Sequence, residues 1–544
     1  MKVVLAEKVS AATAAVFADG GDWNVVTHDQ IKNGLPAELT DADALIVRSA
    51  VQVDDALLQH APKLRVVGRA GVGVDNIDTE AATRRGVVVM NTPGGNAIAV
   101  AELTLGLMIA LARMVPRANA TMHAGKWEKK SLQGTELRGK TLGIIGMGRI
   151  GLEVARRARA FGMELIGHDP FVSAKPKERA AIAREYGARL VSMEEVLREA
   201  DYLTLHVGLT ADTEGLLNAT ALASMKKGVR IINCARGELV VEEALAEAVR
   251  IGQVAGAALD VFRKEPLKDS PLFGLDNVIL TPHIAGSTGE AQEAVGIQIA
   301  EQVRAYLTTG VAQNAVNFPS LSYEEYTAMA PYLELGERLG KFATAIFGAE
   351  MESIHIGYSG SMADMRTEMI RNAALCGVLG SSGHANRVNA SAIAEGQGIH
   401  VHEEKNEAAS SGAGSVLKVT LHAGKLSTQR SMTVSGTVLH GKSPRLLACD
   451  GIDIEAPLEG TLLFIRNQDV PGVIGRIGTT LGENAINIAN FALGRAEASH
   501  GDGRTQALAV VHVDADTGQA QLHQALQSLE ALPAIRSVRL VKLK

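Results

Sequence analysis

Three side chains of the sequence have the types and the order that acid–base chemistry on a small organic acid needs: Arg236, Glu265 and His283. A histidine exchanges a proton near neutral pH, and a carboxylate beside it orients the imidazole and stabilises its charged form. An arginine offers a planar pair of donors that matches a substrate carboxylate. The set therefore predicts proton removal from the hydroxyl group of a 2-hydroxy acid, provided that an acceptor for the hydride binds nearby.

A glycine motif supplies the place for that acceptor. Residues 141–145 are a short apolar run, which predicts a buried strand. The run leads into Gly146, Gly148 and Gly151, which allow a tight turn, the approach of a pyrophosphate, and close packing of the helix that follows. Asp169 lies 18 residues after Gly151, where an acid binds the adenosine ribose hydroxyls and repels a 2′-phosphate. The motif therefore predicts bound NAD rather than NADP.

Each of the three reactive residues follows a predicted strand. These strands are residues 229–233, 256–259 and 278–280. The carboxyl ends of parallel strands meet at one edge of a sheet, so we expect Arg236, Glu265 and His283 to gather at that edge. A lone histidine among 15 is usually structural, so the prediction depends on the complete set.

The first 96 residues predict another α/β unit with candidate ligands of its own. Arg48 and Arg69 each end a predicted strand, and Gly71 and Gly73 follow Arg69. Guanidinium groups and free backbone amides at strand ends are suited to an anionic small molecule. A single surface arginine is usually only solvated, so the two together carry this prediction.

The order of elements predicts four domains. Residues 1–96 with 289–317 are expected to form a substrate-binding domain, and residues 97–288 an NAD-binding Rossmann domain, both doubly wound α/β units. Residues 318–455 predict an intervening α+β domain without a visible catalytic set. Residues 456–544 predict a ferredoxin-like βαββαβ domain.

Composition narrows the class of protein further. The 544 residues carry a net charge of −6, which gives no reason to expect nucleic acid or an anionic membrane as a partner. The N-terminus lacks the pattern of a signal peptide. Cys234, Cys376 and Cys449 are odd in number and scattered, so we expect a cytoplasmic protein without a disulfide framework or a metal site.

The segments GMGRIG with Asp169, NCARGELV, GAALDVFRKEP and PHIAGST, in this order, resemble the D-2-hydroxyacid dehydrogenase family over residues 1–317. LIVRSA, VGRAGVGVDNID, VMNTPGGN, AELTLGLM and HAGKWEKK are similar to the branch of that family that oxidises 3-phosphoglycerate in serine biosynthesis. The tail RNQDVPGVIGRIGTTLGENAINIANF resembles an ACT domain, a regulatory module that binds amino acids between paired copies. Residues 320–455 resemble the extra domain of the long form of that branch.

The resemblance implies NAD-dependent oxidation of 3-phosphoglycerate to 3-phosphohydroxypyruvate, with Arg236, Glu265 and His283 as the catalytic residues. Substrate contacts would come from Arg48 and Arg69 and from the amides of Gly71 to Gly73. The cofactor contacts that it implies are Gly146, Gly148, Arg149, Ile150, Gly151, Asp169, Cys234, Asp260 and Gly286.

The ACT resemblance also implies regulation. Asp469 and Asn487 match positions that hold serine in regulated relatives, which makes L-serine a candidate effector. NAD-binding domains of this family pair, and ACT domains pair again, which implies a homotetramer.

Two alternatives stay open at this point. One is a glyoxylate or hydroxypyruvate reductase of the same family, although such enzymes usually stop near residue 317. The other is an NAD-sensing binding protein like the corepressors that share this fold, although the complete arginine, glutamate and histidine set favours catalysis.

Overall fold

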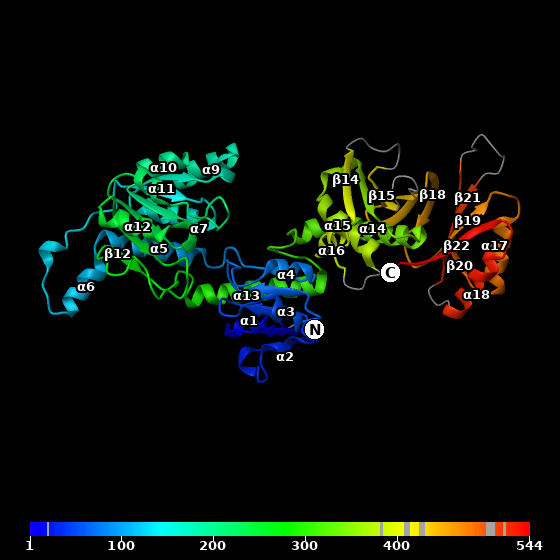
Figure 1. Ribbon diagram of the computed structural model, residues 1–544, viewed down its shortest axis with the longest axis horizontal. Coiled ribbons are helices and arrows are strands. Elements are labelled where there is room, and N and C mark those ends of the chain that lie inside the picture. The colour runs from blue at the N-terminus through cyan, green and yellow to red at the C-terminus, as the bar shows by residue number, and fades with distance from the viewer. Residues whose placement is uncertain are drawn as a thin grey trace.

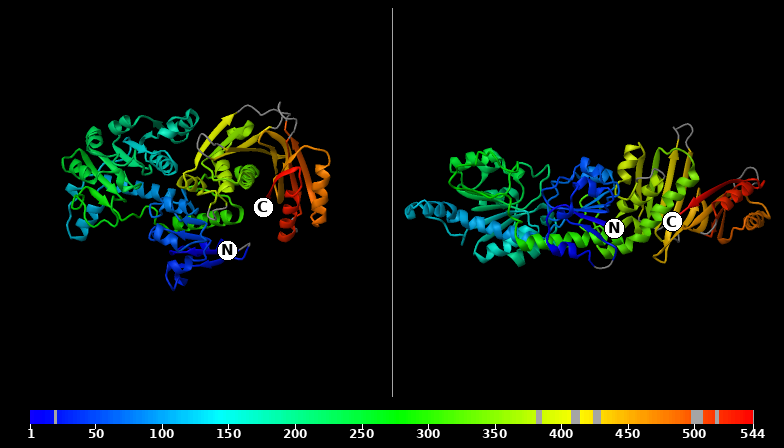
Figure 2. Two further views of the ribbon diagram at one scale, coloured as in Figure 1. Left: turned by 45° about the vertical axis from the view of Figure 1, so that its right-hand side comes forward. Right: turned by 90° about the horizontal axis from the view of Figure 1, so that it is seen from below.

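The computed structural model describes residues 1–18, 21–380, 385–406, 414–423, 430–496, 506–514 and 518–543. Four β-sheets, of five, seven, six and four strands, contain the named strands. The ribbon forms an elongated molecule in which the seven-stranded sheet lies at one end and the four-stranded sheet at the other (Figure 1). Figure 2 shows the same elongated arrangement from below.

The first sheet has the strand order β2-β1-β3-β4-β5, and every pair is parallel. Its strands are β1 (Lys2–Leu5), β2 (Asn24–Val26), β3 (Ala44–Val47), β4 (Val66–Arg69) and β5 (Val88–Met90). The helices between them are α1 (Ala11–Ala15), α2 (Leu35–Leu39), α3 (Asp55–Gln59) and α4 (Thr79–Arg84), with the 3₁₀ helix η1 (His28–Gln30). β2 was not predicted from the sequence.

Helix α13 (Gly289–Thr309) packs against this first sheet although it follows the seven-stranded one in the chain. Gly68 of β4 makes the close approach possible. A Cβ atom there would lie 2.7 Å from Ile299 and 2.9 Å from Val303. The first unit therefore draws one layer of its core from a distant segment.

The second sheet has the order β12-β11-β10-β9-β6-β7-β8, again with parallel pairs only. Its strands are β6 (Thr141–Ile145), β7 (Glu164–His168), β8 (Ala188–Leu190), β9 (Tyr202–Leu205), β10 (Val229–Asn233), β11 (Val254–Leu259) and β12 (Val278–Leu280). The order reverses between β6 and β9, as in dinucleotide-binding folds, where the ligand binds at the strand ends beside that reversal. Both α/β units confirm the predicted fold class.

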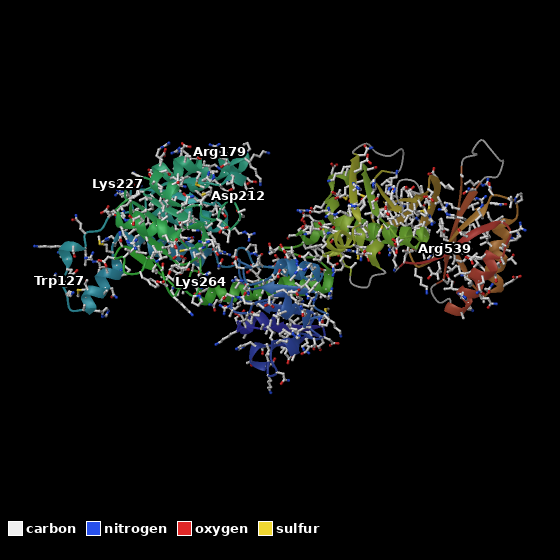
Figure 3. The ribbon with its side chains drawn as sticks, viewed as in Figure 1. Trp127, Arg179, Asp212, Lys227, Lys264 and Arg539 are labelled. Carbon is white, nitrogen blue, oxygen red and sulfur yellow. The ribbon has the colours of Figure 1, made fainter. Side chains whose placement is uncertain are left out.

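Helices cover the second sheet, and one segment projects away from it. The helices are α5 (Ala97–Ala112), α6 (Val115–His123), α7 (Arg149–Ala160), α8 (Pro170–Ser173), α9 (Pro176–Tyr186), α10 (Met193–Glu199), α11 (Ala219–Ser224) and α12 (Glu242–Arg250), with η2 (Lys129–Ser131) and η3 (Gly237–Leu239). We call residues 114–136, which contain α6 and η2, the arm. Figure 3 shows Trp127 at its outer end.

None of the described helices alone is long and apolar enough to cross a membrane. Only α5 and α6 taken together reach that length and composition, and they are bent by 64° at the break between them.

The third sheet has the order β14-β13-β15-β16-β17-β18, in which only β13 and β14 run parallel. Its strands are β13 (Ser353–Ser359), β14 (His400–Asn406), β15 (Val416–Ala423), β16 (Arg430–Leu439), β17 (Ser443–Cys449) and β18 (Ile452–Pro457). The helices of this unit are α14 (Tyr323–Phe347), α15 (Thr367–Leu379) and α16 (Ala390–Gly396), with η4 (Gly360–Asp364). The unit is the predicted α+β domain.

The fourth sheet, in the order β20-β21-β19-β22, is antiparallel in each hydrogen-bonded pair and follows the predicted βαββαβ sequence of elements. The elements are β19 (Thr461–Gln468), α17 (Val473–Glu483), β20 (Ile488–Arg495), β21 (Gln506–Val513), α18 (Gln519–Glu530) and β22 (Ile535–Lys542). One sheet face packs on α17 and α18. The other face packs on the third unit, where the rings of Phe464 and Phe342 meet edge to face at 5.8 Å.

Candidate functional site

The glycine turn after β6 fits a bound pyrophosphate. Gly146 has φ +94°, and a Cβ atom there would lie 2.5 Å from the carbonyl oxygen of His206. A Cβ on Gly151 would lie 2.0 Å from the oxygen of Gly146, so helix and strand approach as predicted. Nothing lies within 4 Å of that position on Gly148, and α7 begins there without a side-chain cap. Free amides at a helix start beside open space suit a phosphate group.

The neighbours of the turn include the predicted cofactor residues Arg149, Ile150 and Asp169. Ile150 is partly buried in the first turn of α7, and the guanidinium of Arg149 lies against Gly94, 2.8 Å from a Cβ there. The Asp169 carboxylate accepts a hydrogen bond from the amide of Met147 at 3.0 Å and caps α8. Asp169 therefore stands at the end of β7 and holds the glycine turn in shape.

The predicted base and its partner are in direct contact. His283 Nδ1 and Glu265 Oε2 are 2.7 Å apart, and Glu265 Oε1 accepts a hydrogen bond from the amide of Phe262 at 3.0 Å. With Nδ1 held by the carboxylate, Nε2 is the ring nitrogen left to exchange a proton. The imidazole is 55% exposed, so a substrate can reach it.

A buried aspartate shapes the loop that carries His283. Asp260 is fully buried, and its carboxylate accepts hydrogen bonds from Thr281 Oγ1 at 2.6 Å and from the amides of Ile284 and Ala285 at 2.9 and 2.8 Å. Its carbonyl oxygen accepts a further bond from the amide of His283 at 2.8 Å. Asp260 therefore fixes the conformation of the loop that carries His283.

The other predicted cofactor residues on this side are Cys234 and Gly286. Cys234 is buried, and this burial raises the pKa of its thiol to about 12, so the sulfur is a neutral neighbour of the strand ends. Gly286 follows the His283 loop and lies against the amide of Asn96. Within the described ranges, no three His, Cys, Asp or Glu side chains are placed to hold a metal ion.

Arg236 joins the two α/β units. Its Nη2 lies 3.2 Å from Asp75 Oδ2 in the first unit, and a Cβ on Gly73 would lie 2.0 Å from the same nitrogen. Its loop is shaped by Asn233, which is fully buried, donates to the carbonyl of Arg236 at 2.8 Å and accepts from the amide of Ala235 at 3.0 Å. The structure therefore brings Arg236 to the glycine loop predicted for the substrate.

Of the predicted substrate residues of the first unit, Arg69, Gly71 and Gly73 lie at that contact, whereas Nη1 of Arg48 donates to the carbonyl of Lys8 at 3.1 Å. Burial, and then the positive charge of Arg236, lower the pKa of Arg69, and Arg48 adds to this effect. A Cβ on Gly71 would fall 1.3 Å from Arg69 Nη1, so only glycine leaves room for this guanidinium. Cationic groups held this close favour an anion between them.

Three residues near the site were not predicted: Asp75, Asn91 and Asn96. Asn91 donates to the carbonyl of Val72 at 2.6 Å and so holds the glycine loop. Asn96 precedes α5 but makes no capping bond, and its buried Oδ1 lacks a partner among the described residues. An asparagine before a helix normally caps it. From the sequence, Asn96 would be interpreted as a helix cap. Its position beside Gly286 could therefore not be predicted.

The predicted regulatory residues lie at opposite ends of the fourth sheet. Asp469 pairs with Arg495, at the end of β20, at 3.3 Å, whereas Asn487 precedes the start of β20 and donates to Asp514 at 2.8 Å. The eight residues of β20 span about 25 Å at the usual rise of a strand. Within one chain, a small amino acid cannot contact both residues.

Comparisons with known proteins agree with this arrangement. Residues 105–285 match the model of the NAD-binding domain of D-isomer specific 2-hydroxyacid dehydrogenases, residues 328–450 the D-3-phosphoglycerate dehydrogenase intervening domain, and residues 461–534 the ACT domain. A D-3-phosphoglycerate dehydrogenase of Methanocaldococcus jannaschii is 41% identical over 500 residues, which cover 91% of this chain and 93% of the relative. The chain belongs to the D-3-phosphoglycerate dehydrogenase family.

A further member of the D-3-phosphoglycerate dehydrogenase family and two solved structures that match the two α/β units support this assignment. A member from Bacillus subtilis is 42% identical over 463 residues, covering 85% of this chain and 86% of that protein. A glyoxylate reductase from Paecilomyes thermophila is 30% identical with a TM-score of 0.51, and a D-lactate dehydrogenase from Aquifex aeolicus, solved with NAD and lactic acid, is 27% identical with a TM-score of 0.50. These two matches cover 58% and 59% of this chain but 98% and 100% of those proteins.

The family assignment confirms three predictions from the sequence. The chain is a dehydrogenase of the D-isomer specific 2-hydroxyacid type, its cofactor is NAD, and it carries an intervening domain and an ACT domain. The shorter reductases and lactate dehydrogenases correspond to little more than the two α/β units.

Proposed function

We propose that this chain oxidises 3-phosphoglycerate to 3-phosphohydroxypyruvate with NAD, the first step of the phosphorylated route to L-serine. The observation that carries the proposal is the cationic cluster of Arg69 and Arg236 around Gly71 and Gly73. A substrate with a phosphate and a carboxylate has the charge to match two guanidinium groups, although the amide of Gly71 already donates to the carbonyl of Arg69 at 2.9 Å. The identity to D-3-phosphoglycerate dehydrogenases over most of the chain, including the intervening and ACT domains, supports the same substrate.

The residues around the cleft have complementary roles in this reaction. Arg236 binds the substrate carboxylate and polarises the C2 oxygen, with Arg48 and Arg69 facing the phosphate. His283 Nε2 accepts the hydroxyl proton, and Glu265 stabilises the resulting imidazolium through Nδ1. Gly146 to Gly151 and Asp169 would hold NAD, which would supply the acceptor for the hydride from C2.

We also propose the domain division expected above, in which residues 1–96 and 289–317 form the substrate-binding domain and residues 97–288 the NAD-binding domain. The packing of α13 on the first sheet, and of α5 on α7, β10 and β11, supports this division. The third and fourth sheets then belong to the intervening and ACT domains, and because β18 (Ile452–Pro457) is part of the third sheet, we place their boundary after Pro457 rather than at 455/456.

A comparison of turnover with different substrates tests the proposed reaction. Pure protein with NAD and 3-phosphoglycerate at alkaline pH should produce NADH, measured by its absorbance. The kcat/KM for 3-phosphoglycerate should be far higher than the kcat/KM for D-glycerate, which lacks the phosphate. No turnover with 3-phosphoglycerate but brisk turnover with D-glycerate, or with glyoxylate in the reverse direction, would reject this substrate.

Homo-oligomerisation through the arm forms part of the proposal. No residue of α6 is buried, and Val115, Met122 and Trp127 are 49%, 55% and 79% exposed. Large apolar side chains on a projecting segment are typical of an interface with another chain. Pairing of NAD-binding domains and of ACT domains would give a homotetramer, which light scattering of the full chain would measure.

The free cysteines Cys234, Cys376 and Cys449 fit a cytoplasmic location.

Inhibition by L-serine should depend on Asn487. Because Asp469 and Asn487 are separated within one chain, a shared site requires two ACT domains, and β20, at the edge of the fourth sheet, is the strand that we propose to pair with its own copy. In an antiparallel pair of β20 strands, Asn487 of one chain lies near Asp469 of the other. Asn487→Ala should raise the inhibitory serine concentration at least about tenfold, since it removes a hydrogen bond to a charged group.

The control for Asn487 is Asn484→Ala, which removes a neighbouring amide that donates only to the carbonyl of Thr480 in its own helix. This variant should keep wild-type inhibition. A wild-type protein that shows neither inhibition by serine nor heat on titration with serine would remove the effector from the proposal.

A further inference from the structure

A polar cavity of about 450 Å³ lies in the third unit, between α15, α16 and the edge strand β14. Its lining includes Arg371, Ser391, Glu395 and Glu403, which belong to neither the catalytic cleft nor the ACT domain. We propose that this cavity binds a small zwitterionic amino acid and that this binding alters the affinity of the substrate-binding domain for 3-phosphoglycerate. The second half of the proposal rests on the proposed function, because it concerns the same substrate.

The cavity holds a guanidinium group ready for a carboxylate. Arg371 Nη1 donates to Glu403 Oε1 at 2.9 Å, and Nε donates to Asn372 Oδ1 at 3.2 Å. The second oxygen of Glu403 accepts from the buried hydroxyl of Tyr358 at 2.8 Å. These bonds fix the guanidinium plane, while Nη2 has no hydrogen-bond partner among the described residues. A fixed guanidinium with free donors recognises a carboxylate group.

The same lining also favours an ammonium group. Glu395 makes no ion pair within the described ranges, and Ser391 Oγ donates to Asn372 Oδ1 at 2.7 Å, which leaves its lone pairs for a ligand donor. Setting His400 aside, one arginine faces two glutamates, so the lining has an excess of negative charge. A simple anion such as phosphate meets repulsion there, whereas a zwitterion satisfies both signs of charge.

The wall of the cavity continues into the contact with the first unit. Asn372 also donates to the carbonyl of Arg387 at 3.1 Å, within the segment that precedes α16. In that segment, Asn386 donates to the carbonyl of Gly86 at 2.9 Å, and Val388 is buried in the core of the first unit. A Cβ on Gly86 would lie 2.1 Å from Asn386 Nδ2, so the two units fit closely at this point.

Gly86 closes the far end of a helix that begins at the substrate loop. Helix α4 starts after Asp78, which caps it, and ends just before Gly86. Asp75, three residues before that cap, is the partner of Arg236. Figure 1 shows α4 beside α16, and the two helices are in contact. A ligand that moves α16 therefore acts on a rigid element whose other end holds the substrate loop.

Binding is tested by calorimetry on the full chain carrying Asn487→Ala, which should weaken serine binding at the proposed ACT site at least about tenfold, so that a tighter second site is measured separately. Glycine, L-alanine and L-serine are titrated in turn, and at least one should give a saturable signal. Glu395→Gln in that background should weaken this binding about tenfold or more, because a charge-assisted hydrogen bond is lost. Glu404→Gln, on the exposed opposite face of β14, is the matched control and should bind as before.

Two results would overturn the binding half of the proposal. One is the absence of heat with all three amino acids, and the other is saturable heat with inorganic phosphate when saturating 3-phosphoglycerate already occupies the catalytic site. Equal affinity in Glu395→Gln and its control would place the ligand elsewhere and overturn it as well.

Coupling is tested through the KM for 3-phosphoglycerate in the same Asn487→Ala background. A saturating amino acid should change KM about fivefold or more. Asn386→Ala should retain amino acid binding and basal turnover but lose this change, and Asn389→Ala, which removes a donor to the carbonyl of Arg84, is the second variant. An unchanged KM despite measured binding would refute the coupling. Absence of basal turnover without any amino acid would instead refute the proposed reaction, and the calorimetry is independent of both.

Discussion

Replacing His283 with alanine should lower kcat for 3-phosphoglycerate oxidation by about 10²- to 10⁴-fold, the range that general base catalysis contributes. The imidazole is the group placed to take the hydroxyl proton, since Glu265 holds its Nδ1 at 2.7 Å and leaves Nε2 exposed. Stopped-flow and steady-state measurement of NADH formation give kcat, and quenching of protein fluorescence gives the NADH affinity, which should stay within about twofold of wild type.

The pairing of His283 with Glu265 sharpens this prediction. Glu265→Gln should also lower kcat, and adding it to His283→Ala should cost little more, because residues that act as a unit are not additive. The matched control is His60→Ala, which removes an exposed histidine at the end of α3 and should retain full turnover. Retention of more than a tenth of kcat in a folded His283→Ala protein would contradict the role of base.

Arg236→Met should lower kcat/KM for 3-phosphoglycerate by about 10²- to 10³-fold, because truncating one partner of a charge pair costs about 2–5 kcal/mol. The methionine keeps the length of the side chain but removes the donors that meet the carboxylate and leaves Asp75 without its partner. Arg236→Lys should recover only part of the loss, since an ammonium group cannot make two parallel bonds.

The measurement for Arg236 separates substrate binding from cofactor binding. The loss should appear in kcat/KM for the substrate, while NADH affinity and thermal unfolding stay close to wild type. Arg198→Met, which removes a 66% exposed guanidinium of the same domain, should have no effect. A kcat/KM within fivefold of wild type in Arg236→Met would show that another cation binds the carboxylate.

Much of the NAD site could be predicted because its determinants are local. The turn at Gly146, the helix start at Gly148 and the acid at Asp169 lie within one strand–helix–strand unit, and their geometry follows from steric limits on the backbone. The order of strands then carries Arg236, Glu265 and His283 to neighbouring strand ends, as expected from β10, β11 and β12.

Other features of the site could not be predicted, because they depend on contacts between distant segments. Asp75 gave no sequence signal, and it pairs with an arginine of another unit. Asp260 was predicted beside the cofactor, but its hydrogen bonds from the segment 281–285 were not. Asn96 has the sequence position of a helix cap, but its amide lies against Gly286.

The sequence by itself determined the α/β succession, the glycine turn and the identity of the reactive side chains, because backbone sterics and the spacing of apolar residues act over a few residues. Only the tertiary structure decided that Arg236 meets the loop of the first unit and that Asp469 and Asn487 lie far apart in one chain, whereas the return of α13 to the first sheet was already expected from the order of elements. The first relation arises when separate units pack against one another, on surfaces assembled from distant segments, and the second arises from the order of strands within the fourth sheet.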